Sequence, residues 1–300
     1  MNTPVLHVTR LVGNTPVLDL TAWAQARGCR GRLFAKLELR NPSGSVKDRT
    51  VLYMLQDALH RGLVQPGGVV IEPSGGNTAL SVSMLCAAMG LQAVILLPDS
   101  VSAARKQRME TFGARLVTFP AAEGREGRDR MLARLQEKLP SAHLLRQFDD
   151  DICCQAHRET TAKEILTQCG SVDFFVAGVG TGATITGCGE MLRMDNPDCR
   201  IIAVEPVDSP VLSGGFPGAH ALTGIGPGFL PEILNNYLLD EVIKVRTPDS
   251  LALCKELARD FGILCGPSSG AALCAALDVA ARAEAADKTI VTVFPDGGML

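Results

Sequence analysis

The pattern of apolar and polar residues divides most of the chain into short buried strands and amphipathic helices. Apolar runs at residues 69–72, 93–97 and 115–119 are typical of strands buried on both faces, and apolar residues at helical spacing lie between them at 79–89 and 103–112. Because strands and helices alternate in this order, the pattern predicts a parallel sheet covered by helices on both faces.

The same pattern begins again near residue 147. A helix is predicted at residues 156–168, and buried strands are predicted at 174–177, 201–205 and 289–294. We therefore expect an α/β protein built from two three-layer domains with mostly parallel sheets. The further predicted elements are a helix at 22–27, strands at 32–39 and 262–265, a helix at 50–59 that is capped at Ser45, and an alanine-rich helix near Ser269.

The restart of the pattern also predicts the domain boundaries. We expect a smaller, mobile domain over residues 42–146 and a larger domain formed by residues 1–41 and 147–300. Ligands of parallel sheets bind at the carboxyl ends of the strands, so the loops that follow the strands are where a site is expected. Residues 209–231 are rich in Gly and Pro and are expected to form a long functional loop.

Composition excludes several classes of partner. The chain has 300 residues, of which 46% are hydrophobic, and its net charge of -3 offers no basic surface for nucleic acid. The ten cysteines show no CxxC or Cys/His spacing, so we expect reduced thiols and no metal site. The chain has no secretion signal and no long apolar run, which favours a cytoplasmic protein that avoids membranes and binds small molecules.

One lysine occupies a position that suits chemistry better than structure. Lys47 lies in the segment NPSGSVKDR (residues 41–49), and a cap at Ser45 would place it in the first turn of a helix. The helix dipole and nearby Arg49 favour the neutral amine, which can attack a carbonyl and form a Schiff base. From this segment alone, a solvated lysine at the start of a helix is the simpler interpretation.

A glycine-rich run predicts an anion site. Residues 178–184, GVGTGAT, follow a predicted strand and open a helix, so their amides can bind a phosphate at the helix N-terminus. Turns of this kind also occur for packing alone, and that alternative stays open. The run lacks the last glycine of GxGxxG and the lysine of a P-loop, which disfavours dinucleotides and nucleoside triphosphates.

Two further polar loops follow predicted strands. They are PSGGNT at residues 73–78 and CGPSSG at residues 265–270. The first is also consistent with a simple turn, and the second with simple N-capping by Ser269. Three such loops together with Lys47 favour a common ligand over three independent turns.

Together these segments resemble the cysteine synthases (O-acetylserine sulfhydrylases), which are fold-type II enzymes that use pyridoxal phosphate (PLP) and share the fold of the tryptophan synthase β subunit. The resemblance extends over nearly the whole chain. The matching segments are VGNTP (12–16), NPSGSVKDR (41–49), HRETT (157–161), EP (205–206), SPVLSGG (209–215), GIGPGF (224–229), GIL (262–264) and FPD (294–296).

The resemblance implies a cofactor site in the cleft between the two domains. Lys47 would hold PLP as a Schiff base, Asn77 would hydrogen-bond the ring hydroxyl, and Ser268 would face the pyridine nitrogen. A neutral serine there makes the ring a weaker electron sink, which suits prompt loss of a β-leaving group. The residues that would cradle the phosphate are Gly180, Thr181, Gly182, Ala183 and Thr184.

The resemblance also implies a substrate site and four departures from the family pattern. The substrate carboxylate would bind at Ser74, Gly75, Gly76, Asn77 and Thr78, with Gln147 as a further contact. The family loop reads Thr-Ser-Gly-Asn-Thr-Gly, so Ser74 replaces a threonine, Gly75 replaces a serine and lacks its hydroxyl, and Ala79 replaces a glycine. In the phosphate run, Ala183 also replaces a glycine. We expect Gly75 to weaken the closure of the smaller domain over the substrate.

The implied reaction is a β-replacement with Lys47 as the base. O-acetyl-L-serine, or a similarly activated serine, would lose its leaving group by β-elimination to an aminoacrylate, and sulfide would add to give L-cysteine. Homocysteine, cysteine or an amine are alternative nucleophiles, although Pro227 and Gly228 leave no acidic side chain in their loop, which favours sulfide. A scaffold protein that keeps the fold without activity is a second alternative. The family implies a homodimer and suggests serine acetyltransferase as a partner.

Overall fold

The computed structural model describes residues 6–298, which divide into two units. The first comprises residues 6–12 and 47–146, and the second comprises residues 13–46 and 147–298.

This division differs from the expected boundaries at two segments. Val8–Leu11 packs against helix α3 (Asn77–Met89) and so belongs to the first unit. Residues 44–46 pair with the backbone of residues 295–297 and so belong to the second. The chain therefore enters the first unit at Lys47.

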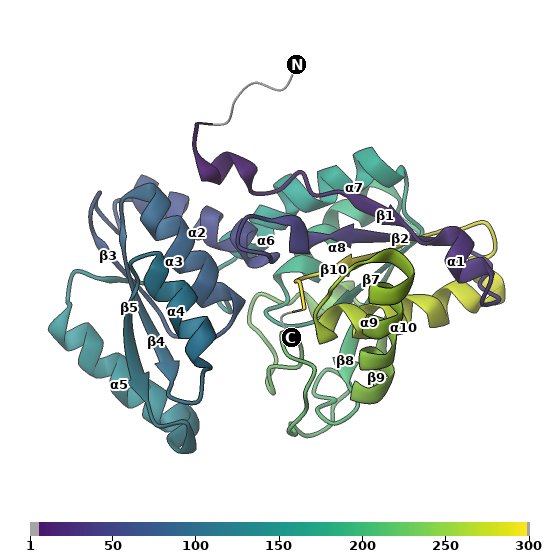
Figure 1. The fold of residues 1–300 in the computed structure, drawn as a ribbon. Helices are drawn as coiled ribbons and strands as arrows, with labels where there is room; N and C mark the ends of the chain where they lie inside the picture. The colour runs from purple at the N-terminus through teal and green to yellow at the C-terminus, as the bar shows by residue number, and fades with distance from the viewer. Residues whose placement is uncertain (1–5, 299–300) are drawn as a thin grey trace. The chain divides into compact units, whose positions relative to one another are not determined.

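A parallel four-stranded sheet in the order β5-β4-β3-β6 forms the centre of the first unit. Ile71, Val94 and Leu96 point to one face and form a core with Leu135 of α5, since alternate residues of a strand face opposite sides. Figure 1 shows α5 on one side of this sheet and α3 and α4 on the other. The elements are β3 (Val69–Glu72), β4 (Gln92–Pro98), β5 (Arg115–Phe119), β6 (His143–Leu144), α2 (Lys47–His60), α3, α4 (Ala103–Thr111) and α5 (Gly124–Lys138).

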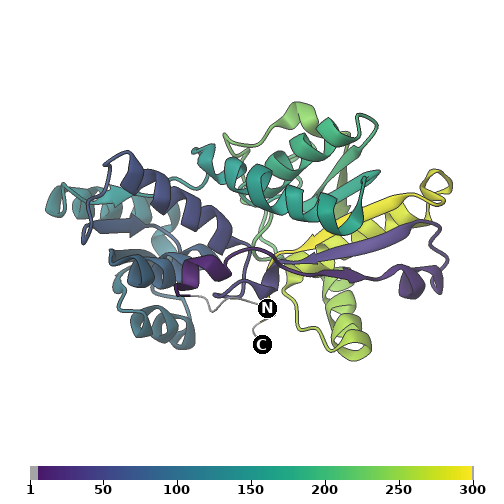
Figure 2. The same ribbon diagram turned by 90° about the horizontal axis from the view of Figure 1, so that it is seen from above.

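A six-stranded sheet in the order β1-β2-β10-β7-β8-β9 forms the centre of the second unit, and only β1 runs antiparallel to its neighbour. Figure 2 shows α7 and α8, in teal, on one side of it and the yellow-green α9 and α10 on the other. The elements are β1 (Val17–Asp19), β2 (Arg32–Leu37), β7 (Phe174–Gly178), β8 (Arg200–Pro206), β9 (Glu241–Val245), β10 (Thr289–Phe294), α1 (Thr21–Gln25), α6 (Ile152–Ala156), α7 (Ala162–Cys169), α8 (Ala183–Asp195), α9 (Thr247–Phe261) and α10 (Pro267–Ala281).

The strands β7 and β10 supply both cores of this sheet. Phe174 and Ile290 face α10, where they pack among its alanines and leucines. Phe175 and Val291 face the opposite side and pack with residues of α7 and α8. Because these strands are covered on both faces, they read as continuous apolar runs in the sequence.

The structure confirms the predicted α/β class, and the strands predicted at 115–119 and 289–294 match β5 and β10. The strand predicted at 262–265 is wrong, because Gly262 ends α9 in the left-handed region at φ 67° and the next residues lead into α10 without sheet pairing. The helix predicted at 156–168 is divided by a π-helical turn, His157–Thr161, between α6 and α7.

Both serines expected to cap helices lie elsewhere. Helix α2 begins at Lys47, so Val46 rather than Ser45 precedes its first residue, and Ser45 instead forms a bridge to Asp296. Helix α10 begins at Pro267 after Gly266, so Ser269 lies inside its first turn, and simple capping by Ser269 is excluded. Among residues 6–298, no helix has both the length and the apolar composition needed to span a membrane.

A buried lysine ties the start of the second unit to its helical layer. The Lys36 side chain in β2 is fully buried, and its Nζ lies 2.7 Å from Glu164 of α7. The same Nζ donates to the Thr15 carbonyl at 2.6 Å and to Gln168 Oε1 at 2.8 Å. These contacts compensate the desolvation of the ammonium group, which a buried charge requires.

Lys36→Ala should lower the free energy of unfolding by about 3 kcal/mol, because it leaves the Glu164 carboxylate without its buried cation. The matched control is Lys288→Ala, which removes an ion pair to Asp173 whose lysine side chain is 50% exposed. Lys288→Ala should lower the free energy of unfolding by less than about 1 kcal/mol. Denaturant unfolding of both variants measures the difference, and equal losses would contradict the assigned role of Lys36.

Candidate active site

Lys47 follows a segment that is fixed to the end of β10. The Val46 amide donates to the Pro295 carbonyl at 2.8 Å, and the Gly297 amide donates to the Gly44 carbonyl at 3.2 Å. Pro295 comes directly after β10, whose last residue is Phe294. The main chain therefore reaches Lys47 one residue after it leaves the carboxyl edge of the second sheet.

A buried network holds the start of the same segment. Asn41 accepts a hydrogen bond from the Gly13 amide at 2.8 Å and donates to the Glu38 carboxylate at 2.8 Å. Thr15 Oγ1 donates to the other Glu38 oxygen at 2.7 Å. Both ends of the segment before Lys47 are thus hydrogen-bonded within the second unit.

In the first unit, the start of α2 lies beside the loop that opens α3. Ser81 Oγ of α3 donates to Asp48 Oδ1 at 2.6 Å in a buried contact. Asn77 and Thr78 are the first two residues of α3, and Ser74 Oγ accepts from the Gly76 amide at 3.2 Å. The structure therefore brings Lys47 and the loop Ser74–Thr78 to neighbouring helix N-termini.

Glu72 is a buried carboxyl group close to Lys47 that the sequence analysis missed. It is the last residue of β3, and its exposed fraction is 1%. Burial raises the pKa of Glu72 to about 8, although the charge of Lys47 acts in the opposite direction. The group is therefore mostly protonated at neutral pH. A carboxylate that ends a continuous apolar strand is the signal that could have identified it.

Gly75 has a specific neighbour that explains the missing side chain. A Cβ atom at Gly75 would lie 2.6 Å from Val101 Cγ2, which is closer than carbon atoms approach without displacement. Val101 comes after β4, near Pro98, whose Cδ would lie 3.6 Å from that Cβ. The absence of a side chain at Gly75 and the presence of the branched Val101 are therefore complementary.

In the second unit, the run 178–184 approaches another loop through backbone alone. A Cβ atom at Gly180 would lie 2.2 Å from the Gly224 carbonyl oxygen, and the Gly226 amide donates to the Val179 carbonyl at 2.9 Å. Gly182 precedes α8 with a left-handed φ of 89°. Only glycine fits the first position, and glycine is strongly favoured at the other.

The remaining residues of this run lie at the start of α8. Thr181 and Ala183 are buried, whereas Thr184 is partly exposed. Ala183 is the first residue of the helix, and its methyl group is accommodated in the core.

Ser268 lies at the same edge of the second sheet. It is buried in the first turn of α10, and its hydroxyl lies 3.5 Å from Asp296 Oδ1. A Cβ atom at Gly224 would lie 3.7 Å from Ser268 Oγ. The loops around Gly180, Gly224, Ser268 and Asp296 thus meet where β7 and β10 end.

Gln147 begins the second long segment of the second unit. The adjacent Phe148 accepts a hydrogen bond from the Ile233 amide at 3.3 Å, and its ring centroid lies 5.1 Å from that of Phe229. The chain at Gln147 is therefore fixed beside residues 229–233. The loop Ser74–Thr78, which was predicted to share substrate contacts with Gln147, belongs to the first unit.

Two of the buried thiols are unsuited to act as nucleophiles. All ten cysteines are free, and seven of them are buried. Burial raises the pKa of the Cys86 and Cys154 thiols to about 12, so neither is a thiolate at neutral pH. Among residues 6–298, no group of three or more His, Cys, Asp or Glu side chains is arranged to hold a metal ion.

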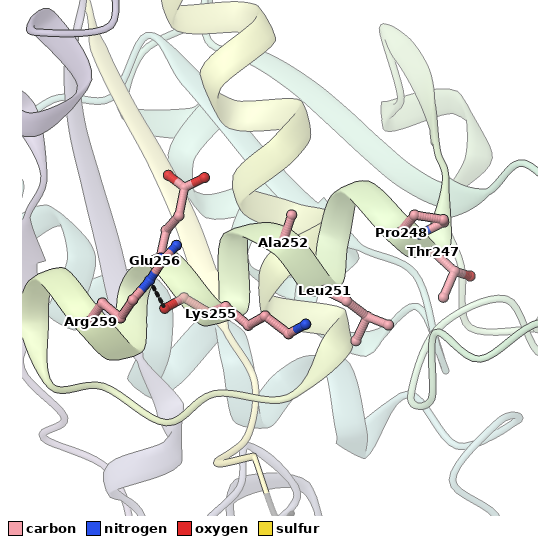
Figure 3. Close-up of a pocket in the computed structure, with 7 residues that line it drawn as sticks. All are labelled: Thr247, Pro248, Leu251, Ala252, Lys255, Glu256 and Arg259. Atoms are coloured by element: carbon pink, nitrogen blue, oxygen red, sulfur yellow. Dashed lines mark hydrogen bonds between the residues drawn. The ribbon is translucent and has the colours of Figure 1, made fainter.

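An open groove of about 500 Å³ along α9 contains none of the predicted site residues (Figure 3). Leu251, Lys255 and Arg259 follow one another at single-turn spacing along the helix. Glu256 also lines the groove and pairs with Arg27 at 3.0 Å. All seven lining residues belong to this one surface helix.

Comparison with known proteins assigns the chain to a family. Residues 8–296 match the family described as "Pyridoxal-phosphate dependent enzyme". A "Probable cysteine synthase" of Bacillus subtilis is 42% identical over 98% of this chain and 95% of its own length.

Two solved structures share the fold. An O-acetyl serine sulfhydrylase isoform 3 from Entamoeba histolytica has a TM-score of 0.94 and 34% identity over 99% of this chain and 91% of its own. An O-acetylserine dependent cystathionine beta-synthase from Helicobacter pylori has a TM-score of 0.91 and 32% identity. The match covers 99% of this chain and 96% of the Helicobacter pylori chain. The chain therefore belongs to the cysteine synthase family of pyridoxal-phosphate-dependent enzymes.

Proposed function

We propose that this protein is a cysteine synthase that replaces the acetoxy group of O-acetyl-L-serine with sulfide to form L-cysteine. The observation that carries the proposal is the placement of Lys47 at the N-terminus of α2, beside the loop Ser74–Thr78, in a chain that is similar to cysteine synthases over 98% of its length. The test is to mix the purified protein with O-acetylserine and sulfide and to measure L-cysteine. A protein that forms none would overturn the proposal.

The residues present suit PLP. The close backbone approach at Gly180, where a Cβ atom would lie 2.2 Å from the Gly224 carbonyl, leaves a cradle of amides at the start of α8 that suits a phosphate. Lys47 supplies the amine that PLP requires. When bound, PLP supplies a conjugated ring that withdraws electrons from the substrate α-carbon.

Each predicted residue has a proposed role toward this cofactor. Lys47 attaches it, Asn77 donates to the ring hydroxyl, and Ser268 faces the pyridine nitrogen. The buried, uncharged Ser268 does not hold a proton on that nitrogen as an aspartate would, which suits the expulsion of a leaving group. The residues proposed to bind the phosphate are Gly180, Thr181, Gly182, Ala183 and Thr184.

The start of α3 is proposed to bind the substrate carboxylate. The positive end of the helix dipole and the amides of its first turn favour an anion there. Ser74 and Thr78 contribute hydroxyl groups, whereas Gly75 contributes only its amide. Gly76, Asn77 and Gln147 complete the proposed set. Lys47 Nζ then takes the proton from the substrate α-carbon, which requires the neutral amine.

Homocysteine is the second candidate for the nucleophile. The relative from Helicobacter pylori is named for cystathionine synthesis, and it has a TM-score of 0.91 to this chain. Pro227 and Gly228 place no acidic group in their loop to bind the amino group of a larger thiol, which favours sulfide. Parallel assays with sulfide, homocysteine, cysteine and an amine separate these candidates.

We further propose that the enzyme acts in the cytoplasm as a homodimer with O-acetylserine and sulfide as its substrates. Serine acetyltransferase is proposed as a partner on the family resemblance alone. O-phosphoserine is the alternative activated substrate, and its kinetic comparison with O-acetylserine identifies the leaving group.

Lys47→Ala should lower kcat by at least about 1000-fold, because it removes both the attachment point of the cofactor and the base. The visible absorption band of the lysine-bound cofactor should disappear. Lys106→Ala is the matched control, since this lysine of α4 donates to the Asp99 carbonyl at 2.7 Å in an exposed contact. Turnover of Lys47→Ala near the wild-type rate would refute the assignment.

Gly75→Ser alone should destabilise the first unit by about 1–3 kcal/mol, because its Cβ overlaps the Val101 methyl. The double variant Gly75→Ser/Val101→Ala should recover this stability and lower KM for O-acetylserine about 2- to 10-fold, since one hydroxyl donor is added. Val101→Ala alone is the control. The carboxylate role of this loop would be contradicted if the double variant bound O-acetylserine no more tightly than Val101→Ala.

Glu72→Gln should make stability less dependent on pH. The folded pKa of Glu72 is raised to about 8, so between pH 5 and 8 the folded state keeps a proton that the unfolded state loses. Wild-type stability should therefore fall as pH rises through this window, by about 1 kcal/mol per pH unit. Glu72→Gln should remove that fall, whereas Glu256→Gln in an exposed ion pair should not. Denaturation midpoints at pH 6, 7 and 8 measure this pH dependence of stability. Parallel plots of midpoint against pH for wild type and Glu72→Gln would refute the buried, protonated carboxyl.

A further inference from the structure

A buried histidine connects the π-helical turn to the start of α8. His157 has an exposed fraction of 1%, and its Nδ1 lies 2.9 Å from Thr161 Oγ1. Its other ring nitrogen, Nε2, lies 3.2 Å from Thr184 Oγ1. The imidazole thus bridges a fully buried hydroxyl and a partly exposed one.

The Thr161 hydroxyl contacts the imidazole within the π-helical turn. A threonine inside an α-helix commonly donates to the carbonyl four residues earlier, which would be that of His157. Here the His157 carbonyl instead accepts the Ala162 amide, in the five-residue pattern of a π-helix. The Thr161 hydroxyl lies 2.9 Å from Nδ1 of the imidazole, so the two residues at the ends of the π-turn contact each other through their side chains.

Close packing fixes the ring against α8. A Cβ atom at Gly187 would lie 2.3 Å from the Cys154 carbonyl and 2.8 Å from His157 Cβ. The glycine therefore lets α8 approach the helix that carries His157, and this approach brings Thr184 within reach of Nε2.

The position of one proton decides what Thr184 offers to a ligand. A hydroxyl has a single proton, so if Thr184 donates to Nε2 it presents only lone pairs to an anion at the helix N-terminus. If Nε2 carries the proton, Thr184 accepts from the ring and its own proton can be donated to the anion. In that arrangement Thr161 donates to Nδ1, which the observed contact allows.

We propose that His157 is a positioning residue that, as the Nε2–H tautomer, turns the Thr184 hydroxyl into a donor to the cofactor phosphate. The inference rests on the proposed function in one respect, namely that the phosphate binds at Gly180–Thr184. His157 touches neither cofactor nor substrate in this arrangement. It acts by donating to Thr184, while the Thr161 hydroxyl donates to Nδ1.

The test compares PLP with pyridoxal, which lacks the phosphate, in binding titrations of the full chain freed of cofactor. His157→Leu should weaken PLP about tenfold and pyridoxal less than twofold, because one charge-assisted hydrogen bond is affected. His157→Gln, which keeps an N–H near Nε2, should restore PLP affinity to within about threefold. His157→Asn, which retains a group only near Nδ1, should be as weak as His157→Leu and serves in its place if that variant does not fold.

A double-variant cycle separates positioning from a structural role. In a Thr184→Val background, which lacks the hydroxyl, His157→Leu should have no further effect on PLP affinity. Loss of pyridoxal and PLP affinity in equal measure, or a full effect in the Thr184→Val background, would overturn the role of His157.

The same titrations distinguish this failure from failure of the proposed function. If Thr184→Val weakens PLP selectively and His157→Leu does not, only the positioning role is wrong. If the wild-type chain binds no PLP, the proposed function is wrong and the inference falls with it.

Discussion

The hydrogen bond from the Val46 amide to the Pro295 carbonyl, 2.8 Å long, holds the residue that directly precedes the proposed catalytic lysine. It holds the main chain at the carboxyl end of β10 immediately before Lys47 starts α2. Asn41 and Glu38 fix the segment at its other end, in buried contacts with Gly13 and Thr15. The segment that leads to Lys47 is therefore held within the second unit at both of its ends.

The second constraint is that the loops of the second unit meet through backbone rather than side chains. The approach of Gly180 to the Gly224 carbonyl leaves no room for a Cβ atom, and the Gly266 amide donates to the Asp296 carbonyl at 3.1 Å. Amides brought together in this way are fixed dipoles that do not reorganise when an anion arrives, which lowers the free-energy cost of binding. Side chains such as Thr184 then add donors whose direction depends on their neighbours.

Much of the fold could be predicted because buried parallel strands leave continuous apolar runs. β5 and β10 were found to the residue, and β4 within one residue at each end. The run at 262–265 is also apolar. However, Gly262 ends α9 in the left-handed region and α10 begins at Pro267, so too few residues lie between the two helices for a paired strand. The π-turn at His157–Thr161 left no periodic signal, since one extra residue per turn does not alter a short apolar pattern.

The candidate site could be predicted only in part. The residues alone left Lys47 open to interpretation as a solvated lysine, and the family resemblance supplied its role. Glu72 and the pairing of Gly75 with Val101 were missed, because both depend on contacts between segments that are distant in sequence or meet only in the folded unit. Burial of Lys36 was missed for the same reason, since its partner Glu164 lies 128 residues further along the chain.

The side-chain exchanges that the family resemblance implies at Gly75 and Ala183 each fit their local surroundings. At Gly75 the space that a serine Cβ would need is filled by a Val101 methyl, 2.6 Å from where that atom would lie. At Ala183 the added methyl is buried in the core beneath α8 and leaves the glycines at 180 and 182 to shape the loop. Neither exchange removes a backbone amide from the helix N-termini of α3 or α8. Anion binding at these helices depends on amides and dipoles, so it tolerates such exchanges, whereas the number of hydroxyl donors around the substrate does not. The proposed site can therefore keep the cofactor chemistry of the family with one hydroxyl donor fewer for the substrate.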